Sequence, residues 1–342
     1  MKNSMYMKQN KIILFIVTTI TLTSCIGSNK NVVNVYSTRH YTVDGEIFDA
    51  FTKQTGIKVN IIKSDPEALL TRLEQEKKAP QADVFFTADY PRLYRAKEKG
   101  LLEAIKTDTL LKQTSPKYRD KDNFWYGMSL RLRIIAIDTN WTGARPSTYA
   151  DLTNEIYKGK ILVRSGGNAY NISLIASLLA QWGETRTKEF LKRFVANFAR
   201  TPEGNDRKQV ADIYAKKGSL AIINTYYMGL MYTSVDPEVQ NAAKSVDLIY
   251  PQDTHFNISG FGVIKNAKNK VNAIKLLEFV TSEYAQKKIT LENYEYPVNP
   301  NVAPTDIFLK WKDSPKMDNV ELDTWGSYYE RAAILIDEAA WK

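Results

Sequence analysis

Hydrophobic and polar positions alternate in blocks through the first hundred residues of the chain. Three short β-rich or continuously apolar runs predict strands at 32–38, 57–64 and 82–88. Stretches with apolar residues at helical spacing follow them and predict helices at 43–56, 65–80 and 90–100. The regular succession of strand and helix favours a parallel sheet with right-handed crossovers.

The same alternation begins again later in the chain. The predicted strands of this second unit are 133–139, 161–165, 220–225 and a strand near 261–265. Its predicted helices are the segment after the glycine-rich turn at 166–167, then 185–199, a long helix over 269–288, and the tail at 325–341. In open α/β sheets ligands bind beyond the carboxyl ends of the strands, so the residues that follow each strand are the first candidates for a site.

The length of the chain favours two lobes. Its 342 residues exceed the roughly 250–300 that one hydrophobic core usually supports, and no long linker separates the two α/β units. We expect each lobe to be a mixed sheet flanked by helices, with shared crossover segments between them. The predicted N-terminal lobe comprises 32–126 and 258–300, and the predicted C-terminal lobe comprises 127–257 and 301–342.

The first 24 residues have the features of a lipoprotein signal peptide. Three lysines and no acidic residue precede an apolar core at 12–22, which is shorter than the about 20 residues that span a bilayer. The sequence Leu-Thr-Ser-Cys then ends at Cys25 and resembles a lipobox, the site at which bacterial lipoproteins are cleaved and lipidated. Cys25 is the single cysteine of the chain, so we expect a lipid anchor there, a tether over 25–31, and no intramolecular disulfide.

Composition argues against nucleic acid as a partner. The formal net charge is +9, of which the leader lysines supply three, and the remaining Lys and Arg residues are mixed with acidic ones along the chain. A nucleic-acid-binding protein usually concentrates its basic residues in one stripe. We therefore predict a solvated surface, and export of the chain points the same way.

Tyrosines recur directly after predicted strands of both units. Tyr41 follows the first strand, Tyr170 follows the strand at 161–165, and Tyr226 and Tyr227 follow the strand at 220–225. Adjacent side chains in a strand point to opposite faces, but in the first turn of a helix capped by Asn224 or Thr225 the pair can face one ligand. The free N–H groups of such a turn favour anions nearby. Packing of the two rings is the alternative.

Several phenolates and one imidazole at the strand ends indicate a hard, highly charged cation. A phenol has a pKa near 10, so it is an anion at neutral pH only where a cation holds its charge. Hard cations prefer oxygen ligands, and three phenolates neutralise a trivalent ion. The chain has two histidines, His40 and His255, and no cysteine beyond Cys25, which disfavours zinc and copper. Ferric iron is the abundant candidate.

The chain resembles the periplasmic ferric-iron-binding proteins of ABC transporters, a class of two-lobed solute-binding proteins. The resemblance spans nearly the whole mature chain. It is carried by VYSTRHY (35–41), ADVFFTADYPRLYRAKEKGLL (82–102), SLRLRII (129–135), RSGGNAYN (164–171), NTYYMG (224–229), NISGFGVIKNAKNK (257–270) and YPVNP (296–300). It implies a type II periplasmic solute-binding fold with the ligand in the cleft between the lobes.

The resemblance also implies a site and a biological role. The implied iron ligands are Tyr226, Tyr227, Tyr170, Tyr41 and His40, as in the tyrosine-rich subgroup, in part of which the histidine does not bind. A carbonate or other synergistic anion would pair with Arg131 or Arg39, with Arg133 and Arg164 behind them. The implied protein is a monomer on the outer side of a bacterial membrane that delivers Fe(III) to an ABC-transporter permease.

Two other function classes stay open from the sequence. The same fold could bind another small ligand, such as an oxyanion, a polyamine or chelated iron. An exported enzyme is the second alternative, but the chain has no G-x-S-x-G or H-E-x-x-H motif. We therefore predict no enzymatic activity. Elsewhere, the adjacent pair Tyr328 and Tyr329 lies in a helical segment and is predicted to pack, as is Tyr36. Tyr90 and Tyr94 are at helical spacing and are predicted to lie at the surface or to pack.

Overall fold

The computed structural model describes residues 31–309 and 316–342. The predicted leader, the lipobox at Cys25 and all but the last residue of the tether lie outside these ranges. Within them, no helix is both long enough and apolar enough to cross a membrane.

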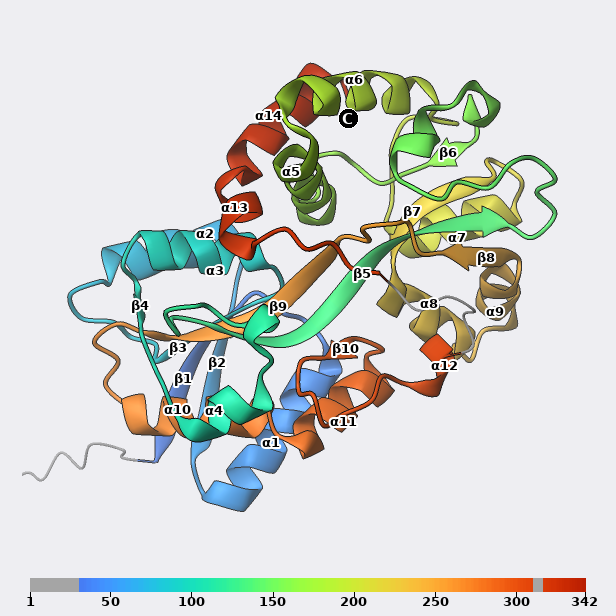
Figure 1. The fold of residues 1–342 in the computed structure, drawn as a ribbon. Helices are drawn as coiled ribbons and strands as arrows, with labels where there is room; N and C mark the ends of the chain where they lie inside the picture. Colours follow the sequence, from blue (N-terminus) through green and yellow to red (C-terminus); the bar gives the residue numbers. More distant parts are fainter. Residues whose placement is uncertain (1–30, 310–315) are drawn as a thin grey trace, which may run out of the picture. The chain divides into compact units, whose positions relative to one another are not determined.

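Ten strands of the described residues form one mixed sheet (Figure 1). The strands are β1 (Val32–Ser37), β2 (Lys58–Lys63), β3 (Val84–Thr87), β4 (Leu102–Glu103), β5 (Tyr126–Asp138), β6 (Ile161–Leu162), β7 (Leu220–Asn224), β8 (Val246–Ile249), β9 (Phe256–Ile264) and β10 (Tyr296–Pro297). Along the main path the order is β2-β1-β3-β9-β5-β7-β6. The predicted parallel pairing holds for β1 with β2 and β3 and for β6 with β7, whereas β9 and β5 are inserted antiparallel.

The strands β5 and β9 are longer than their hydrophobic patterns predicted. β5 begins at Tyr126 rather than at 133, and β9 begins at Phe256 rather than near 261. All their residues are buried, including the polar and charged side chains that interrupt the apolar runs. The first half of β5 pairs with β9 and its second half pairs with β7 and β8, so β5 belongs to both groups of strands.

Helices cover the sheet and connect its strands (Figure 1). They are α1 (Thr42–Thr55), α2 (Pro66–Gln75), α3 (Tyr90–Glu98), α4 (Asp108–Gln113), α5 (Ala169–Trp182), α6 (Glu184–Ala196), α7 (Asp206–Tyr214), α8 (Thr225–Tyr232), α9 (Pro237–Lys244), α10 (Lys270–Val280), α11 (Glu283–Glu292), α12 (Asp306–Leu309), α13 (Leu322–Ser327) and α14 (Tyr329–Glu338). Short 3₁₀ helices lie at Pro116–Tyr118, Ala150–Thr153 and Glu155–Tyr157.

Local capping explains both correct and incorrect helix predictions. α1 is followed by Gly56, which caps the helix with a left-handed φ of 70° that glycine adopts at low cost. The prediction of one long helix over 269–288 is wrong, because the helix is interrupted between α10 and α11. There Ser282 accepts a hydrogen bond from the Ala285 amide at 3.4 Å and starts a new helix. The helical tail is likewise divided, at Tyr328.

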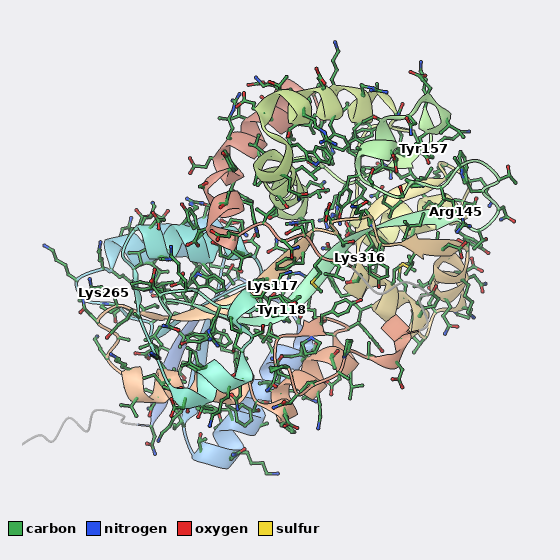
Figure 2. All side chains as sticks on the ribbon, in the orientation of Figure 1. Lys117, Tyr118, Arg145, Tyr157, Lys265 and Lys316 are labelled. Atoms are coloured by element: carbon green, nitrogen blue, oxygen red, sulfur yellow. The ribbon has the colours of Figure 1, made fainter. Side chains whose placement is uncertain are left out.

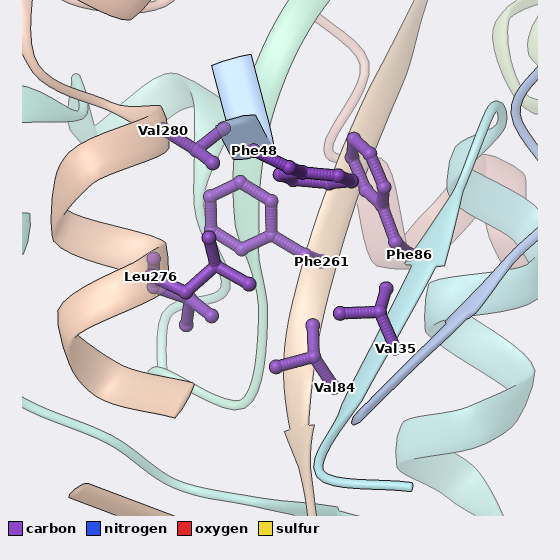
Figure 3. A pocket seen from close by; sticks show the side chains of 8 residues that line it. Val35, Phe48, Val84, Phe86, Phe261, Leu276 and Val280 are labelled. Carbon is purple, nitrogen blue, oxygen red and sulfur yellow. The ribbon is translucent and has the colours of Figure 1, made fainter. Parts of the chain in front are cut away.

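The apolar side chains form two buried clusters. One consists of residues from 33–128 and 261–289, and it contains a small apolar cavity (Figure 3). Phe48, Phe86 and Phe261 are among the residues that line the cavity. The other cluster takes residues from both halves of the chain, from Tyr36 to Trp341. Tyr90 lies in this second cluster, where it contacts Trp125 and Trp325, so of the two predicted positions, surface or packing, it packs.

The segment after residue 315 packs against a loop from the first half of the chain. Lys117 Nζ donates a hydrogen bond of 3.0 Å to the Asp318 carbonyl, and the Tyr118 hydroxyl lies 3.6 Å from Met317 Sδ. Figure 2 labels Lys117 and Tyr118 next to each other and labels Lys316, the first residue of the segment that follows residue 315. His255 is buried beside this segment, with its ring centroid 5.4 Å from that of Trp325.

Candidate metal centre

Four tyrosines from three separate loops lie together in the structure. Tyr41 is the residue before α1 and follows β1, Tyr170 lies in the first turn of α5 after β6, and Tyr226 and Tyr227 lie in the first turn of α8 after β7. Each position is the carboxyl end of a strand followed by the start of a helix. The chain therefore places these phenols where the sequence predicted a binding site.

The rings of Tyr41 and Tyr226 are in direct contact. Their centroids are 5.9 Å apart and their planes are inclined by 80°, an edge-to-face arrangement. Tyr226 is buried, and Tyr41 is half-buried. This contact joins the loop after β1 to the start of α8.

The adjacent tyrosines face one region rather than opposite sides. The ring centroids of Tyr226 and Tyr227 are 4.1 Å apart with an interplanar angle of 31°. Asn224 is the residue that precedes α8, as predicted, although its side chain makes no capping hydrogen bond. The helical first turn thus permits the convergence that a strand would have prevented.

Burial and mutual repulsion raise the pKa of Tyr226 and Tyr41, so these two phenols stay protonated when no cation is present. Burial raises the pKa of Tyr226 well above its usual value, and the neighbouring Tyr170, Tyr41 and Tyr227 raise it further. Burial likewise raises the pKa of Tyr41, with a further contribution from Tyr170. Only a strongly charged cation can displace several such protons together.

A buried arginine lies behind Tyr41. The guanidinium carbon of Arg39 is 4.5 Å from the centroid of the Tyr41 ring. Arg39 forms two hydrogen bonds of 2.9 Å to the carboxylate of Asp44 and one of 3.0 Å to Glu295 Oε2. The positive charge beside Tyr41 is therefore fixed in orientation and already paired with carboxylates.

A second buried arginine lies behind Tyr170. The guanidinium carbon of Arg131 is 5.3 Å from the Tyr170 ring centroid. Arg131 donates to Ser259 Oγ at 2.9 Å and to the Ala88 carbonyl, and its Nη1 is 3.4 Å from Glu295 Oε1. Glu295 therefore lies between both predicted anion partners, and no feature of the sequence pattern distinguished it beforehand.

Arg133 and Arg164 share one carboxylate on the other side of the site. Arg133 Nη1 is 2.6 Å from Asp206 Oδ2, and Arg164 Nη1 is 3.3 Å from Asp206 Oδ1. The guanidinium carbon of Arg164 is also 5.5 Å from the ring centroid of Tyr170. The sequence analysis named both arginines but missed Asp206, whose helix α7 it did not predict.

The structure does not bring His40 to the four tyrosines. Its side chain is exposed, and the described residues show no ring contact or hydrogen bond between it and Tyr41, Tyr170, Tyr226 or Tyr227. Its role as a ligand stays a prediction. The second Tyr-Tyr pair lies elsewhere. Tyr328 is exposed, and Tyr329 packs against the second apolar cluster, which runs from Tyr36 to Trp341.

The donor set of the site is made of oxygen atoms. Among the described residues no three His, Cys, Asp or Glu side chains cluster in a way that could hold a metal ion. The tyrosines offer four phenol oxygens instead, with fixed positive charges behind them. Such a set matches a hard trivalent cation and disfavours the softer ions that take nitrogen and sulfur ligands.

Proteins with similar sequences are named as iron uptake or ferric iron-binding proteins. Iron uptake protein A1 of Synechocystis is 39% identical over 316 residues, which cover 91% of this chain and 87% of that protein. The major ferric iron-binding protein of Neisseria meningitidis serogroup A is 26% identical over 320 residues, which cover 91% of this chain and 93% of that protein.

Solved structures give the same picture. A Trichodesmium protein in complex with iron and citrate ligands is 40% identical and superposes with a TM-score of 0.85, covering 91% of this chain and all of that one. A ferric binding protein from Campylobacter jejuni is 34% identical, also with a TM-score of 0.85 and the same coverage. The chain thus has the α/β fold of the periplasmic binding proteins, as predicted.

A family model described as bacterial extracellular solute-binding protein matches residues 79–318. This match covers more than half of the chain and includes Tyr170, Tyr226 and Tyr227. Together with the relatives that align along nine-tenths of the chain, it shows that the chain belongs to the bacterial extracellular solute-binding protein family.

Proposed function

We propose that this protein captures ferric iron outside the cytoplasm and passes it to an ABC-transporter permease. The observation that carries the proposal is the convergence of Tyr41, Tyr170, Tyr226 and Tyr227 at the carboxyl ends of strands. The names of the relatives support it, since they include iron uptake proteins and ferric iron-binding proteins.

The chemistry of capture follows from the charges. Ferric iron enters as the cargo, and each phenol that binds it loses its proton to solvent. Four phenolates would carry one negative charge more than the metal neutralises. Arg133 and Arg164 share Asp206, Arg39 and Arg131 are matched by Asp44 and Glu295, and the guanidinium carbon of Arg207 lies 5.9 Å from the Tyr227 ring centroid. These five arginines outnumber the three carboxylates, so the surrounding shell has enough positive charge to compensate the fourth phenolate.

Two further ligands are proposed in addition to the tyrosines. His40 lies one residue before Tyr41 and its side chain is exposed, so a modest movement of this residue would be needed for its imidazole to bind. A carbonate or similar anion would approach Arg131 or Arg39. Both arginines already have protein partners, so such an anion would have to compete with Glu295 for them.

The proposed release and transport steps involve two lobes. Residues 32–126 with 258–300 would form one, and 127–257 with 301–342 the other; the separate apolar cluster formed by 33–128 and 261–289 supports the first of them. Tyr41 would move with the first lobe and the other three tyrosines with the second. Hinge closure around iron then gives the permease a shape that differs between loaded and empty protein.

We place the mature protein, as a monomer, on the outer side of a bacterial membrane. The leader over 1–24 and a lipid anchor on Cys25 support this location, with 25–31 as the tether. The proposed protein has no enzymatic activity and does not bind nucleic acid.

A visible absorption band tests the proposal. Ferric iron bound to phenolates absorbs visible light by charge transfer from ligand to metal, so the iron-loaded protein should be coloured. The double variant Tyr226→Phe/Tyr227→Phe should lose the band, whereas Tyr328→Phe should keep it. A wild-type protein that stays colourless with ferric iron, or that binds an oxyanion, a polyamine or only an intact iron chelate in native mass spectrometry, would refute the assignment.

A further inference from the structure

A buried carboxylate joins the chain segments that carry three of the four tyrosines. Asp206 is the first residue of α7 and its side chain is buried. Its Oδ2 accepts a hydrogen bond of 2.7 Å from the backbone N–H of Asn224, the residue directly before α8. Asp206 therefore fixes the start of the helix that presents Tyr226 and Tyr227.

The same carboxylate reaches the segment of the third tyrosine through an arginine. Arg133 in β5 pairs with Asp206 Oδ2 at 2.6 Å, and its Nη2 donates to Asn171 Oδ1 at 2.6 Å. Asn171 directly follows Tyr170, and its amide nitrogen donates to the carbonyls of Arg164 and Ser165 at 3.2 and 2.9 Å. This limb holds the first turn of α5 against the loop before it.

A second set of contacts links Asp206 through Arg164 to the ring of Tyr170. Arg164 pairs with Asp206 Oδ1 at 3.3 Å, and its guanidinium carbon lies 5.5 Å from the centroid of the Tyr170 ring.

We propose that Asp206 is a positioning residue that sets the relative placement of Tyr170, Tyr226 and Tyr227. It contacts none of the three phenols and acts through Asn224, Arg133 and Arg164. A buried carboxylate with three partners in fixed directions is a rigid junction, because losing one partner leaves another charge buried and unpaired. The inference rests on the proposed function, since it concerns the geometry that ferric iron would meet.

The test compares two carboxylates of one helix. Asp206→Asn keeps the size of the side chain and can still accept from the Asn224 amide, but it removes the charge that holds both arginines. Asp212→Asn is the matched control, because Asp212 is also buried in α7 and is 2.6 Å from Arg200 Nη2, without contact to the tyrosine-bearing segments. Ferric affinity is measured by competition with citrate, together with the visible band and the melting temperature of each iron-free protein.

The expected result separates positioning from a general loss of stability. Asp206→Asn should bind ferric iron about 10–100-fold more weakly, the range found when groups that orient metal ligands are removed, and should shift the band maximum. Asp212→Asn should keep both the affinity and the band of the wild type, even if its melting temperature falls. Wild-type affinity and an unshifted band in Asp206→Asn, or an equal loss in both variants, would overturn the proposal.

A second variant decides the matter if Asp206→Asn does not fold. Arg133→Lys keeps the charge but cannot bond to Asp206 and Asn171 together, so it should also weaken ferric binding and shift the band. Unchanged values in Arg133→Lys would then count against the proposal. A wild-type protein without iron affinity or colour would instead refute the proposed function.

Discussion

Replacing Glu295 by glutamine removes the carboxylate that the two buried arginines behind Tyr41 and Tyr170 share. Glu295 is fully buried and lies 3.0 Å from Arg39 and 3.4 Å from Arg131. In the variant Arg39 keeps Asp44, but among the described residues Arg131 retains only the neutral acceptors Ser259 and the carbonyl of Ala88. Arg131 then becomes a buried cation without a carboxylate.

The structure gives both the size of this effect and its pH dependence. Removing one member of a buried ion pair costs about 3–5 kcal/mol. Since glutamine can still accept a hydrogen bond, we expect a loss near the lower limit, about 3 kcal/mol of unfolding free energy. Burial acts to raise the pKa of Glu295, but attraction by Arg39 and Arg131 outweighs it, so the folded pKa is below the usual value. The stabilisation is therefore complete above the unfolded pKa of about 4.3 and is lost as the pH falls through the folded one.

Urea unfolding of the iron-free protein measures the difference. Tryptophan fluorescence and circular dichroism are recorded for wild type and Glu295→Gln at pH 7 and in steps below pH 4.5. The deficit should be largest at pH 7 and should shrink in acid. Glu184→Gln, which breaks an exposed pair with Arg331, is the control and should have a far smaller effect. A loss of less than about 1 kcal/mol at pH 7, the range of exposed ion pairs, would refute the reasoning.

Three other predictions concern the site and its support. The raised pKa values of Tyr41 and Tyr226 mean that iron binding releases protons, so ferric affinity in competition with citrate should fall more than tenfold per pH unit on acidification; a pH-independent affinity would contradict this. Tyr41→Phe should weaken ferric binding and shift the visible band, whereas the exposed Tyr328→Phe should match wild type in both titrations; equal behaviour of the two variants would exclude Tyr41 from the site. Gly229→Ala should lower the free energy of unfolding by about 1–3 kcal/mol, because the added Cβ would lie 2.2 Å from Tyr294 Cγ. Gly45→Ala in α1 meets open space and should stabilise the protein by up to about 1 kcal/mol. Thermal unfolding measures both, and a melting temperature that is higher for Gly229→Ala than for Gly45→Ala would contradict the packing.

The positions of the four tyrosines were predictable from sequence because they depend on local signals. Each follows a strand that its apolar or β-branched residues reveal, and each lies directly before a helix or in its first turn. A helical first turn at 226–227 could be inferred because Asn224 or Thr225 is a suitable N-cap. Adjacency was not the signal, because Tyr328 and Tyr329 are adjacent as well and lie away from the site.

The surrounding charges were only half predictable, because they depend on contacts between distant segments. The arginines of β5 were named through the resemblance to the family, but their carboxylate partners were not. Glu295 comes from a loop 164 residues away from Arg131, and Asp206 comes from a helix whose polar sequence gave no clear periodicity. Nothing local distinguishes such carboxylates from the many solvated ones.

The same limit explains the errors in the fold. The pattern stopped β5 and β9 short because buried polar residues such as Asn257 and Ser259 look like strand ends. The pattern predicted one helix in place of α10 and α11, because nothing in the sequence shows that Ser282 accepts a hydrogen bond from the Ala285 amide and starts a new helix. In both cases tertiary contacts, which a local pattern does not contain, decided the structure.

A crystal structure of the protein with ferric iron tests the central claim most directly. The account predicts a single iron with the phenolate oxygens of Tyr41, Tyr170, Tyr226 and Tyr227 at about 2 Å, the distance typical of oxygen ligands to small cations. The same structure shows whether His40 or an anion completes the set. Iron bound elsewhere, or contacted by fewer than three of these oxygens, would contradict the account.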